Sequence, residues 1–314
     1  IIQQRVAALL TIPSAGFNSE NHATLVSRIP FSGIGIHSGA PSRIIVHPSS
    51  SGGIRFTDKK GGGKCFKSIP ASWKTVSDTR LSTTLTADGL SISTVEHLMA
   101  ALTGLGITDA LIETFGPEIP IMDGSALPFA TAILQAGIRS TGPGRWLIRL
   151  LKPVEISHDG HFAGLYPTND DELHLDVEID FPHAAIGRQR WTGQLDDRTF
   201  LEEIAPARTF GFIAEMTKLQ EAGLALGATM TSAIGLADDG SAANPEGLRF
   251  PDELVRHKAL DVIGDLSLAG ARIAAQYIGR KPGHAMNLAL LKALFADSSA
   301  WQLEGVRHAS ALAA

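Results

Sequence analysis

The chain has 314 residues, of which 44% are hydrophobic, 19% charged and 6% aromatic, which is ample apolar material for the core of a folded protein. Its formal net charge of −5 argues against a general nucleic-acid binder, because that role usually needs a basic balance. A single cysteine, Cys65, excludes an internal disulfide and a zinc site made of several cysteines, and it fits a reducing compartment such as the cytoplasm. No apolar run approaches about 18 residues, so no integral membrane segment is expected.

The first part of the chain is expected to be a short extension, residues 1–21, and then an α+β domain, residues 22–142. Alternating runs broken by Gly, Ser and Pro predict short strands from His22 to about Leu90. The elements expected after these strands are a helix over 94–106 capped by Ser93 or Thr94, a strand over 108–116 and a helix over 125–138. Gly and Pro at 140–145 predict a linker.

Residues 143–314 are expected to form a second domain of similar plan. The elements predicted there are strand-like runs over 146–157, 161–167 and 172–182, a helical stretch over 200–223 with a break near 207–211, a long helix over 252–270, a strand over 271–280 and a closing helix over 287–297. Because strands precede helices in both parts, the fold class predicted is α+β with two similar domains.

His257 and Asp261 lie four residues apart in the long predicted helix, in the run "HKALD". With about 3.6 residues per turn, their side chains stack on one face and can grip the same partner. Imidazole and carboxylate are both zinc donors. The alternative is that the two residues contact only each other, as surface His–Asp pairs do.

Glu96 and His97 are adjacent in the first turn of the helix predicted over 94–106. Neighbouring helical side chains point about 100° apart, so one can hold a metal while the other acts on a water beside it. The simpler interpretation is that Glu96 favours the helix N-terminus through the macrodipole and His97 packs. His284, in "RKPGHAMN", is either a polar loop residue or a general acid or base.

Together these residues make a hydrolytic site. His97, His257 and Asp261 are three zinc donors that leave a fourth position open, which is the ligand count of a catalytic site. Glu96 then serves as the base, and His284 as the acid that protonates a departing amine. The motif H-E-x-x-H is absent, so a thermolysin-like peptidase is disfavoured.

Six blocks resemble the zinc-dependent UDP-3-O-acyl-N-acetylglucosamine deacetylases of lipid A biosynthesis. They are "GIGIHSG" (33–39), "TVEHLMAALTGLGI" (94–107), "PEIPIMDGSALPF" (117–129), "ARTFGF" (207–212), "LRFPDELVRHKALDVIGDL" (248–266) and "KPGHAMN" (281–287). The resemblance runs from His22 to Ala296 and implies helices packed between two sheets. It also implies a UDP-linked acyl sugar as substrate.

The resemblance also implies a role for each site residue. Zinc is expected on His97, His257 and Asp261, although the same donors also allow Fe²⁺. The expected roles are Glu96 as base, His284 as acid or as a cation that steadies the intermediate, Asp265 to orient His284, Thr209 to donate to the oxyanion, and Lys258 and Lys281 to meet the UDP group. An insert at about 210–232 is expected to line an acyl passage, with Phe210, Phe212, Met216 and Leu224 as candidates; ordinary packing is the alternative for these four.

Several points stay open at this stage. Residues 1–21 are extra to the family, "TMTSAIG" (229–235) departs from it, and Ala274 or Ala275 replaces a usual glycine. Arg256 and Arg280 either add positive potential for UDP or are solvated surface, and Asp123 and Ser125 are expected to cap a turn. The alternative functions are a non-catalytic descendant stabilised by zinc and a deacetylase of a different N-acetyl sugar. The protein is expected to be a cytoplasmic monomer without nucleic-acid partners.

Overall fold

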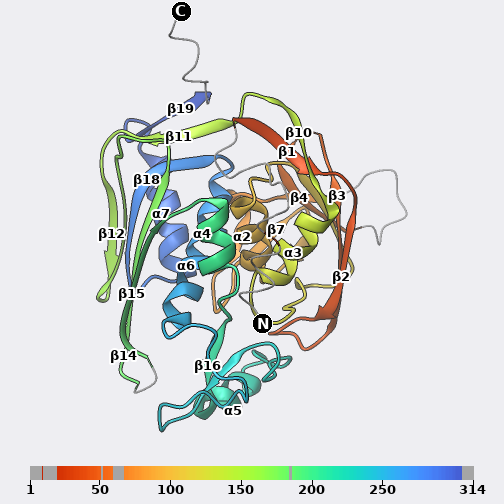
Figure 1. Cartoon of the computed structure of the whole chain (residues 1–314), viewed down its shortest axis with the longest axis vertical. Coiled ribbons are helices and arrows are strands. Elements are labelled where there is room, and N and C mark those ends of the chain that lie inside the picture. Colours follow the sequence, from red (N-terminus) through yellow and green to blue (C-terminus); the bar gives the residue numbers. More distant parts are fainter. Residues whose placement is uncertain (1–8, 10–19, 51, 59–66, 184–185, 306–314) are drawn as a thin grey trace, which may run out of the picture.

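The computed structural model describes residues 9, 20–50, 52–58, 67–183 and 186–305. It has two large β-sheets on the outside and a layer of helices between them (Figure 1). This confirms the predicted fold class. The loop predicted over 59–64 lies outside the described residues, as does the extension over 1–21 except for Leu9, Glu20 and Asn21.

One large sheet comes from the first part of the chain, with the strand order β2-β3-β9-β4-β5. Its strands are β2 Ile29–Ile34, β3 Pro41–Pro48, β9 Ala110–Thr114, β4 Ile54–Asp58 and β5 Ser68–Pro70. Two smaller sheets accompany it, formed by β1 Asn21–Leu25 with β10 Ile138–Pro143, and by β6 Val76–Asp78, β7 Thr84–Ala87 and β8 Leu90–Ile92.

The other large sheet comes from the second part of the chain, and its central strand β18 is paired on both edges. Its strands are β11 Trp146–Leu150, β12 Val154–His158, β13 His161–Tyr166, β14 Leu173–Phe181, β15 Gly187–Gln194, β18 Arg272–Arg280 and β19 Trp301–Gly305. Strands β11 and β14 run parallel to β18, whereas β13 runs antiparallel to it. A two-stranded parallel pair, β16 Phe210–Phe212 and β17 Ile234–Leu236, lies in the lower projection of Figure 1.

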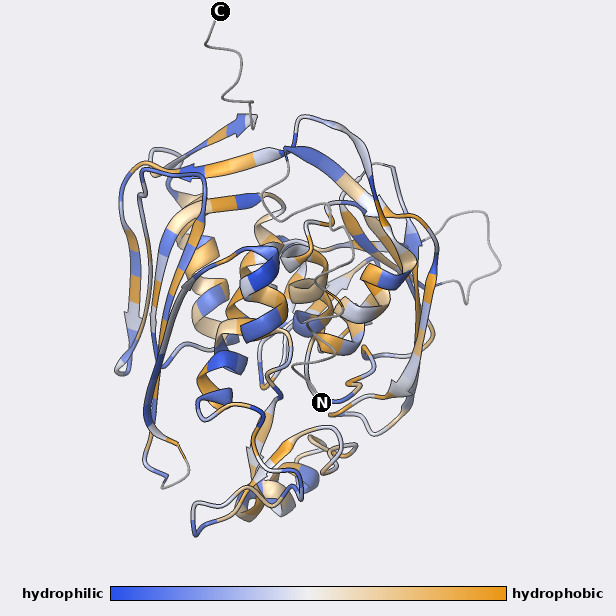
Figure 2. Ribbon diagram, viewed as in Figure 1, coloured by the Kyte–Doolittle hydropathy of each residue, from blue (hydrophilic) through white to orange (hydrophobic). Residues whose placement is uncertain are grey.

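The layer between the sheets holds the longer helices, which are α2 Glu96–Gly104, α3 Leu127–Ala136, α6 Glu253–Leu266 and α7 His284–Ala296. Shorter helical segments are α4 Asp197–Thr199, α5 Met216–Glu221, the π-helix η2 Phe200–Ile204 and the 3₁₀ helices η1 Trp73–Thr75, η3 Ile213–Glu215 and η4 Ser267–Ala269. Orange, hydrophobic residues recur along the helices and the strands of both sheets (Figure 2), and the buried ones form one core cluster. Helix α2 is buried along nearly its whole length, which explains its nearly unbroken apolar run.

Most predicted elements have their counterparts within a few residues, but some details differ, among them the linker predicted over 140–145, most of which belongs to strand β10. Helix α2 has no side-chain cap, because its N-cap residue is the apolar Val95; Thr94 precedes it, and its hydroxyl donates to Glu118 (2.8 Å). The run 146–157 is two strands rather than one. The stretch 200–223 is helical on both sides of the expected break, in η2 and in η3 with α5, and strand β16 forms at the break through pairing with β17.

The predicted division of the chain near residue 142 falls where strand pairing changes sheets. Strand β10 pairs with β1, whereas β11 pairs with β18 and β19. We propose that the boundary between the domains lies between these two strands. None of the helices among the described residues is both long and apolar enough to cross a membrane.

Candidate metal centre and active site

The site forms where α2 and α6 touch backbone to backbone. A Cβ atom on Gly264 of α6 would lie 2.2 Å from the carbonyl oxygen of Glu96, so only glycine allows this approach. Because Glu96 and His97 open α2, the contact brings the start of that helix against the last turn of α6, one turn after Asp261. His97 thereby meets His257 and Asp261, which are far away in the sequence.

His97, His257 and Asp261 form a buried cluster whose ligand atoms all lie within 4.8 Å of one another. The Asp261 Oδ1 atom is 3.7 Å from His97 Nε2 and 3.5 Å from His257 Nε2. These separations are long for hydrogen bonds. They match donors held tetrahedrally around one ion at about 2.0–2.2 Å, which lie roughly 3.4 Å apart. The donor set and its spacing therefore fit a divalent metal.

The surroundings of the cluster keep it ready to bind a cation. His257 Nδ1 donates to the carbonyl oxygen of Ala207 (3.1 Å), which leaves Nε2 with its lone pair toward the cluster. Burial lowers the pKa of both imidazoles, that of His97 to about 3, so both are neutral at pH 7. Burial alone would raise the pKa of Asp261, but Lys258, whose Nζ is 3.0 Å from Oδ2, and the imidazoles outweigh it and lower that pKa.

Glu96 and His284 face each other beside the cluster, with His284 Nε2 3.9 Å from Glu96 Oε1. Burial raises the pKa of Glu96 to about 7, and the positive charge of His284 opposes part of that rise. Burial would lower the pKa of His284, but the charge and the hydrogen bond of Asp265, 2.8 Å from Nδ1, raise it to about 10. Near pH 8 the pair is thus a carboxylate beside an imidazolium, which is a base beside an acid.

Residues that the sequence analysis did not single out hold this pair in place. The backbone N–H of Thr83 donates to Glu96 Oε2 (3.0 Å), and its hydroxyl donates to Asp265 Oδ1 (2.6 Å). The Asn287 amide donates to Asp265 Oδ2 (2.8 Å) and accepts from the Tyr277 hydroxyl (2.8 Å). Asn287 was visible in the block "KPGHAMN", one turn after His284, but no signal around Thr83 pointed to this function.

Glu118, which the sequence analysis also missed, ties the block "GIGIHSG" to the start of α2. Its buried carboxylate accepts from the backbone N–H groups of His37 (3.0 Å) and Ser38 (2.9 Å) and from the hydroxyls of Ser38 and Thr94. A Cβ on Gly35 would lie 2.1 Å from Glu118 Oε2. The glycines and the acid of these two blocks therefore form one unit.

The expected substrate residues divide into those beside the cluster and those farther away. Lys258 Nζ lies 5.5 Å from the centre of the Phe210 ring, and that ring lies 6.4 Å from the His257 ring. Thr209, the residue directly before Phe210, donates its backbone N–H to Gly124 O (2.8 Å). The other two expected substrate residues have partners outside the cluster: Phe212 contacts Phe181 and His183, and Lys281 pairs with Asp180 (3.2 Å).

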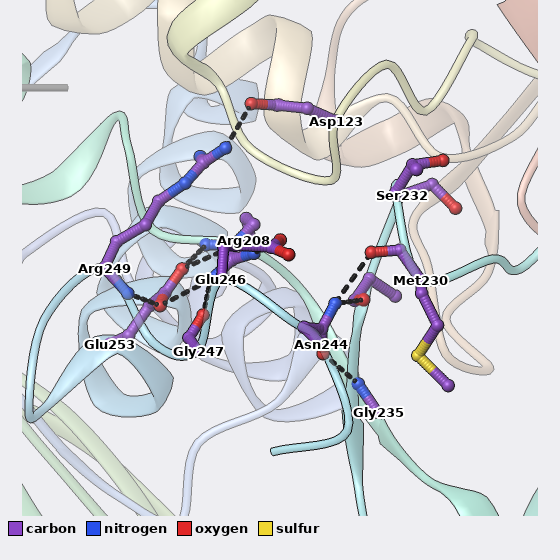
Figure 3. A network of polar contacts seen from close by, with 12 residues as sticks. Asp123, Arg208, Met230, Ser232, Gly235, Asn244, Glu246, Gly247, Arg249 and Glu253 are labelled. Carbon is purple, nitrogen blue, oxygen red and sulfur yellow. Dashed lines mark hydrogen bonds and ion pairs between the residues drawn. The ribbon is translucent and has the colours of Figure 1, made fainter. Parts of the chain in front are cut away.

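Four polar residues with open interpretations have clear partners. Asp123 accepts from the backbone N–H and the hydroxyl of Ser125, which is the expected turn-capping role, and it also pairs with Arg249 (2.8 Å; Figure 3). Arg256 pairs with Asp252 and Glu203, and Arg280 pairs with Asp176. Both arginines are therefore held by carboxylates.

Comparison with known proteins agrees with this geometry. The family model described as "LpxC: UDP-3-O-acyl N-acetylglycosamine deacetylase" matches residues 22–296. A UDP-3-O-acyl-N-acetylglucosamine deacetylase of Myxococcus xanthus is 42% identical over 292 residues, covering 93% of this chain and 91% of the relative. Proteins of the same name from Anaeromyxobacter dehalogenans (42% over 283 residues, 90% of each chain) and Neisseria meningitidis serogroup C (41% over 282 residues, 88% of this chain and 91% of the relative) are also similar. The resemblance found in the six sequence blocks is confirmed, and the chain belongs to the UDP-3-O-acyl N-acetylglycosamine deacetylase family.

Proposed function

We propose that the chain is a zinc-dependent amidohydrolase acting on UDP-3-O-acyl-N-acetylglucosamine. It hydrolyses the acetamide at the 2-amino group to give acetate and UDP-3-O-acyl-glucosamine, the committed step of lipid A biosynthesis. The observation that carries the proposal is the buried His97–His257–Asp261 cluster beside an opposed acid–base pair. The names of the relatives supply the substrate.

Zn²⁺ is the metal that best suits two neutral imidazoles and one carboxylate with an open fourth position, and Fe²⁺ is compatible with the same donors. The chemistry that a bound ion supplies is Lewis acidity toward the acetyl carbonyl and a lower pKa for water. His97, His257 and Asp261 would hold it, and the Ala207 carbonyl and Lys258 would orient two of these ligands.

The proton transfers fall to Glu96 and His284. As a carboxylate, Glu96 accepts a proton from the attacking water, and the Thr83 N–H keeps its other oxygen fixed. As an imidazolium, His284 donates a proton to the nitrogen of the departing amine, while Asp265 holds its Nδ1. Because His284 Nε2 lies only 3.9 Å from Glu96 Oε1, one acetamide could reach both groups.

The rest of the substrate would follow the surface beside the cluster. Thr209, whose backbone N–H donates to Gly124 O, would offer its hydroxyl to the developing oxyanion. Lys258 and Lys281 would meet the diphosphate; Lys281 is 43% exposed at its side chain and can exchange Asp180 for a phosphate. Phe210 and Phe212 would contact the acyl chain. Cytoplasmic location and a monomeric state stay predictions from the sequence.

One assay separates this function from its two alternatives. Purified protein is incubated with UDP-3-O-acyl-N-acetylglucosamine, with and without a chelator, and released acetate is measured. Chelator-sensitive release supports the proposal. No release from metal-loaded protein favours the non-catalytic descendant, although the presence of Glu96 and His284, neither of them a metal ligand, argues against it. Release only from other N-acetyl sugars favours the remaining alternative.

A further inference from the structure

Glu253 opens α6 one turn before His257, and its carboxylate is fully buried. Its Oε1 atom accepts from the backbone N–H (3.0 Å) and from Nε (2.8 Å) of Arg208. Its Oε2 atom accepts from Arg208 Nη2 (3.2 Å) and from the backbone N–H of Arg249 (2.5 Å). All four contacts are visible in Figure 3 as one network. A carboxylate with four donors can fix its neighbours in a single arrangement.

The Glu253 carboxylate fixes Arg208, and the backbone on either side of Arg208 contacts the site. Directly before it, the carbonyl oxygen of Ala207 accepts from His257 Nδ1 (3.1 Å). Directly after it, the N–H of Thr209 donates to Gly124 O. The guanidinium of Arg249 adds a hydrogen bond to Pro206 O (2.8 Å). Ala207 and Arg208 are thus tied to α6, the helix that carries His257, and the residues on either side of them are held by Arg249 and Gly124.

We propose that Glu253, acting through Arg208, is a positioning residue for the metal ligand His257. Because a carbonyl oxygen only accepts, the bond to Ala207 requires the proton of the neutral imidazole to be on Nδ1. The Nε2 lone pair then points toward Asp261 and His97. Glu253 keeps the Ala207 carbonyl where that proton needs it, so it sets both the tautomer and the ring orientation of His257. This inference rests on the metal site of the proposed function.

The same network supplies a matched control. Glu246 also binds Arg208, through Nη1 (2.6 Å), but its side chain is 55% exposed, and among the described residues its carboxylate accepts no hydrogen bond from the backbone of residues 206–209. Glu253→Gln and Glu246→Gln therefore make the same chemical change against the same arginine. Only Glu253→Gln removes an oxygen of a carboxylate that accepts from the backbone N–H groups of Arg208 and Arg249.

The test measures two properties of the purified full-length chain. The first is the Kd for Zn²⁺, by competition with a chelator. The second is the tautomer of His257 in the metal-free protein, measured by two-bond ¹⁵N–¹H correlation NMR. The imidazole signal of His257 is assigned as the one that disappears in His257→Gln. For Glu253→Gln we expect a Zn²⁺ Kd raised about 10–100-fold, as for other residues that orient a metal-bound histidine, and a mixture of His257 tautomers. Glu246→Gln should keep the wild-type Kd within about twofold and the Nδ1–H tautomer.

A folded Glu253→Gln protein with the wild-type Kd and only the Nδ1–H tautomer would overturn the proposal, since a purely structural Glu253 would alter melting alone. If Glu253→Gln does not fold, Glu253→Asp replaces it. This variant keeps the charge opposite Arg208, but its shorter side chain cannot reach both backbone N–H groups. An unchanged Kd and an unchanged tautomer in Glu253→Asp would overturn the proposal equally. The tautomer needs no metal. Wild-type protein that binds no Zn²⁺ would therefore count against the proposed metal site, while the tautomer still decides the role of Glu253.

Discussion

The backbone contact between α2 and α6 makes Gly264→Ala the sharpest test of how the site is assembled. The new Cβ would lie 2.2 Å from the oxygen, 2.8 Å from the carbonyl carbon and 3.0 Å from the Cα of Glu96. These are all backbone atoms, so no side chain can rotate away. Relief requires α2 to move from α6 by about 1 Å, because ordinary contacts between such atoms begin near 3.4 Å.

Two effects of opposite sign set the change in stability. Overpacking of this kind costs about 1–3 kcal/mol, and alanine in place of glycine within a helix returns roughly 0.5–1 kcal/mol. We expect a net loss of about 1 kcal/mol in the free energy of unfolding of the metal-free protein. The effect on metal binding should be larger, because His97 moves with α2 while His257 and Asp261 stay on α6. A shift of about 1 Å exceeds the roughly 0.5 Å that a preorganised site tolerates, so the Kd for Zn²⁺ should rise at least about tenfold.

Urea unfolding of metal-free protein and chelator competition for Zn²⁺ measure the two quantities separately. Gly305→Ala is the control, since a Cβ there meets nothing within 4 Å. A Gly264→Ala protein that is as stable as wild type would refute the steric argument. A protein that loses stability but binds Zn²⁺ normally would show that α2 can shift without moving His97.

Three further predictions concern the residues of the reaction. Glu96→Gln should bind Zn²⁺ normally yet lose about 10²–10⁴-fold in kcat, whereas near-normal turnover would remove Glu96 from the role of base. His257→Ala should lose stoichiometric metal in elemental analysis, and retained metal would exclude it as a ligand. Activity should rise with pH as Glu96 ionises and fall as His284 deprotonates, with pKa values of about 7 and about 10 before metal shifts both downward. Asp265→Asn should move the fall in activity at high pH to a lower pH, because it removes the charge that raises the pKa of His284. If the fall stays at the same pH, a group other than His284 causes it.

The sequence predicts α2 and α6 well because both depend on local patterns, and the three candidate donors on them lie together in the structure. An apolar run with His at i and Asp at i+4 indicates a buried helix that presents both to one point. The meeting of His97 with that pair was a hypothesis from chemistry and family resemblance. No local pattern reports that a glycine at 264 faces the backbone of Glu96.

What the sequence did not predict depends on long-range partners. The Thr83 hydroxyl reaches Asp265 across 182 positions of the chain, and no spacing rule reveals such a contact. Thr94 has the side chain of a helix cap, but the N-cap position falls on Val95, and the Thr94 hydroxyl donates to the buried carboxylate of Glu118. Buried polar groups must find partners wherever the fold brings them, so their pairings emerge only once the sheets and helices are assembled.

The charges around the cluster indicate why the site suits a dication. Glu96, Asp261 and Asp265 supply three negative charges when ionised, Lys258 and protonated His284 supply two positive ones, and the imidazoles of the cluster are neutral. In the metal-free protein Glu96 ionises less readily, because burial and the neighbouring aspartates raise its pKa to about 7. A bound dication would reverse the sign of the total and favour the ionised base. It would also leave one positive charge in a buried place, where a developing oxyanion is stabilised far more than in water. Since buried charges are costly unless compensated, this arrangement is better explained by catalysis of a reaction with an anionic transition state than by stability.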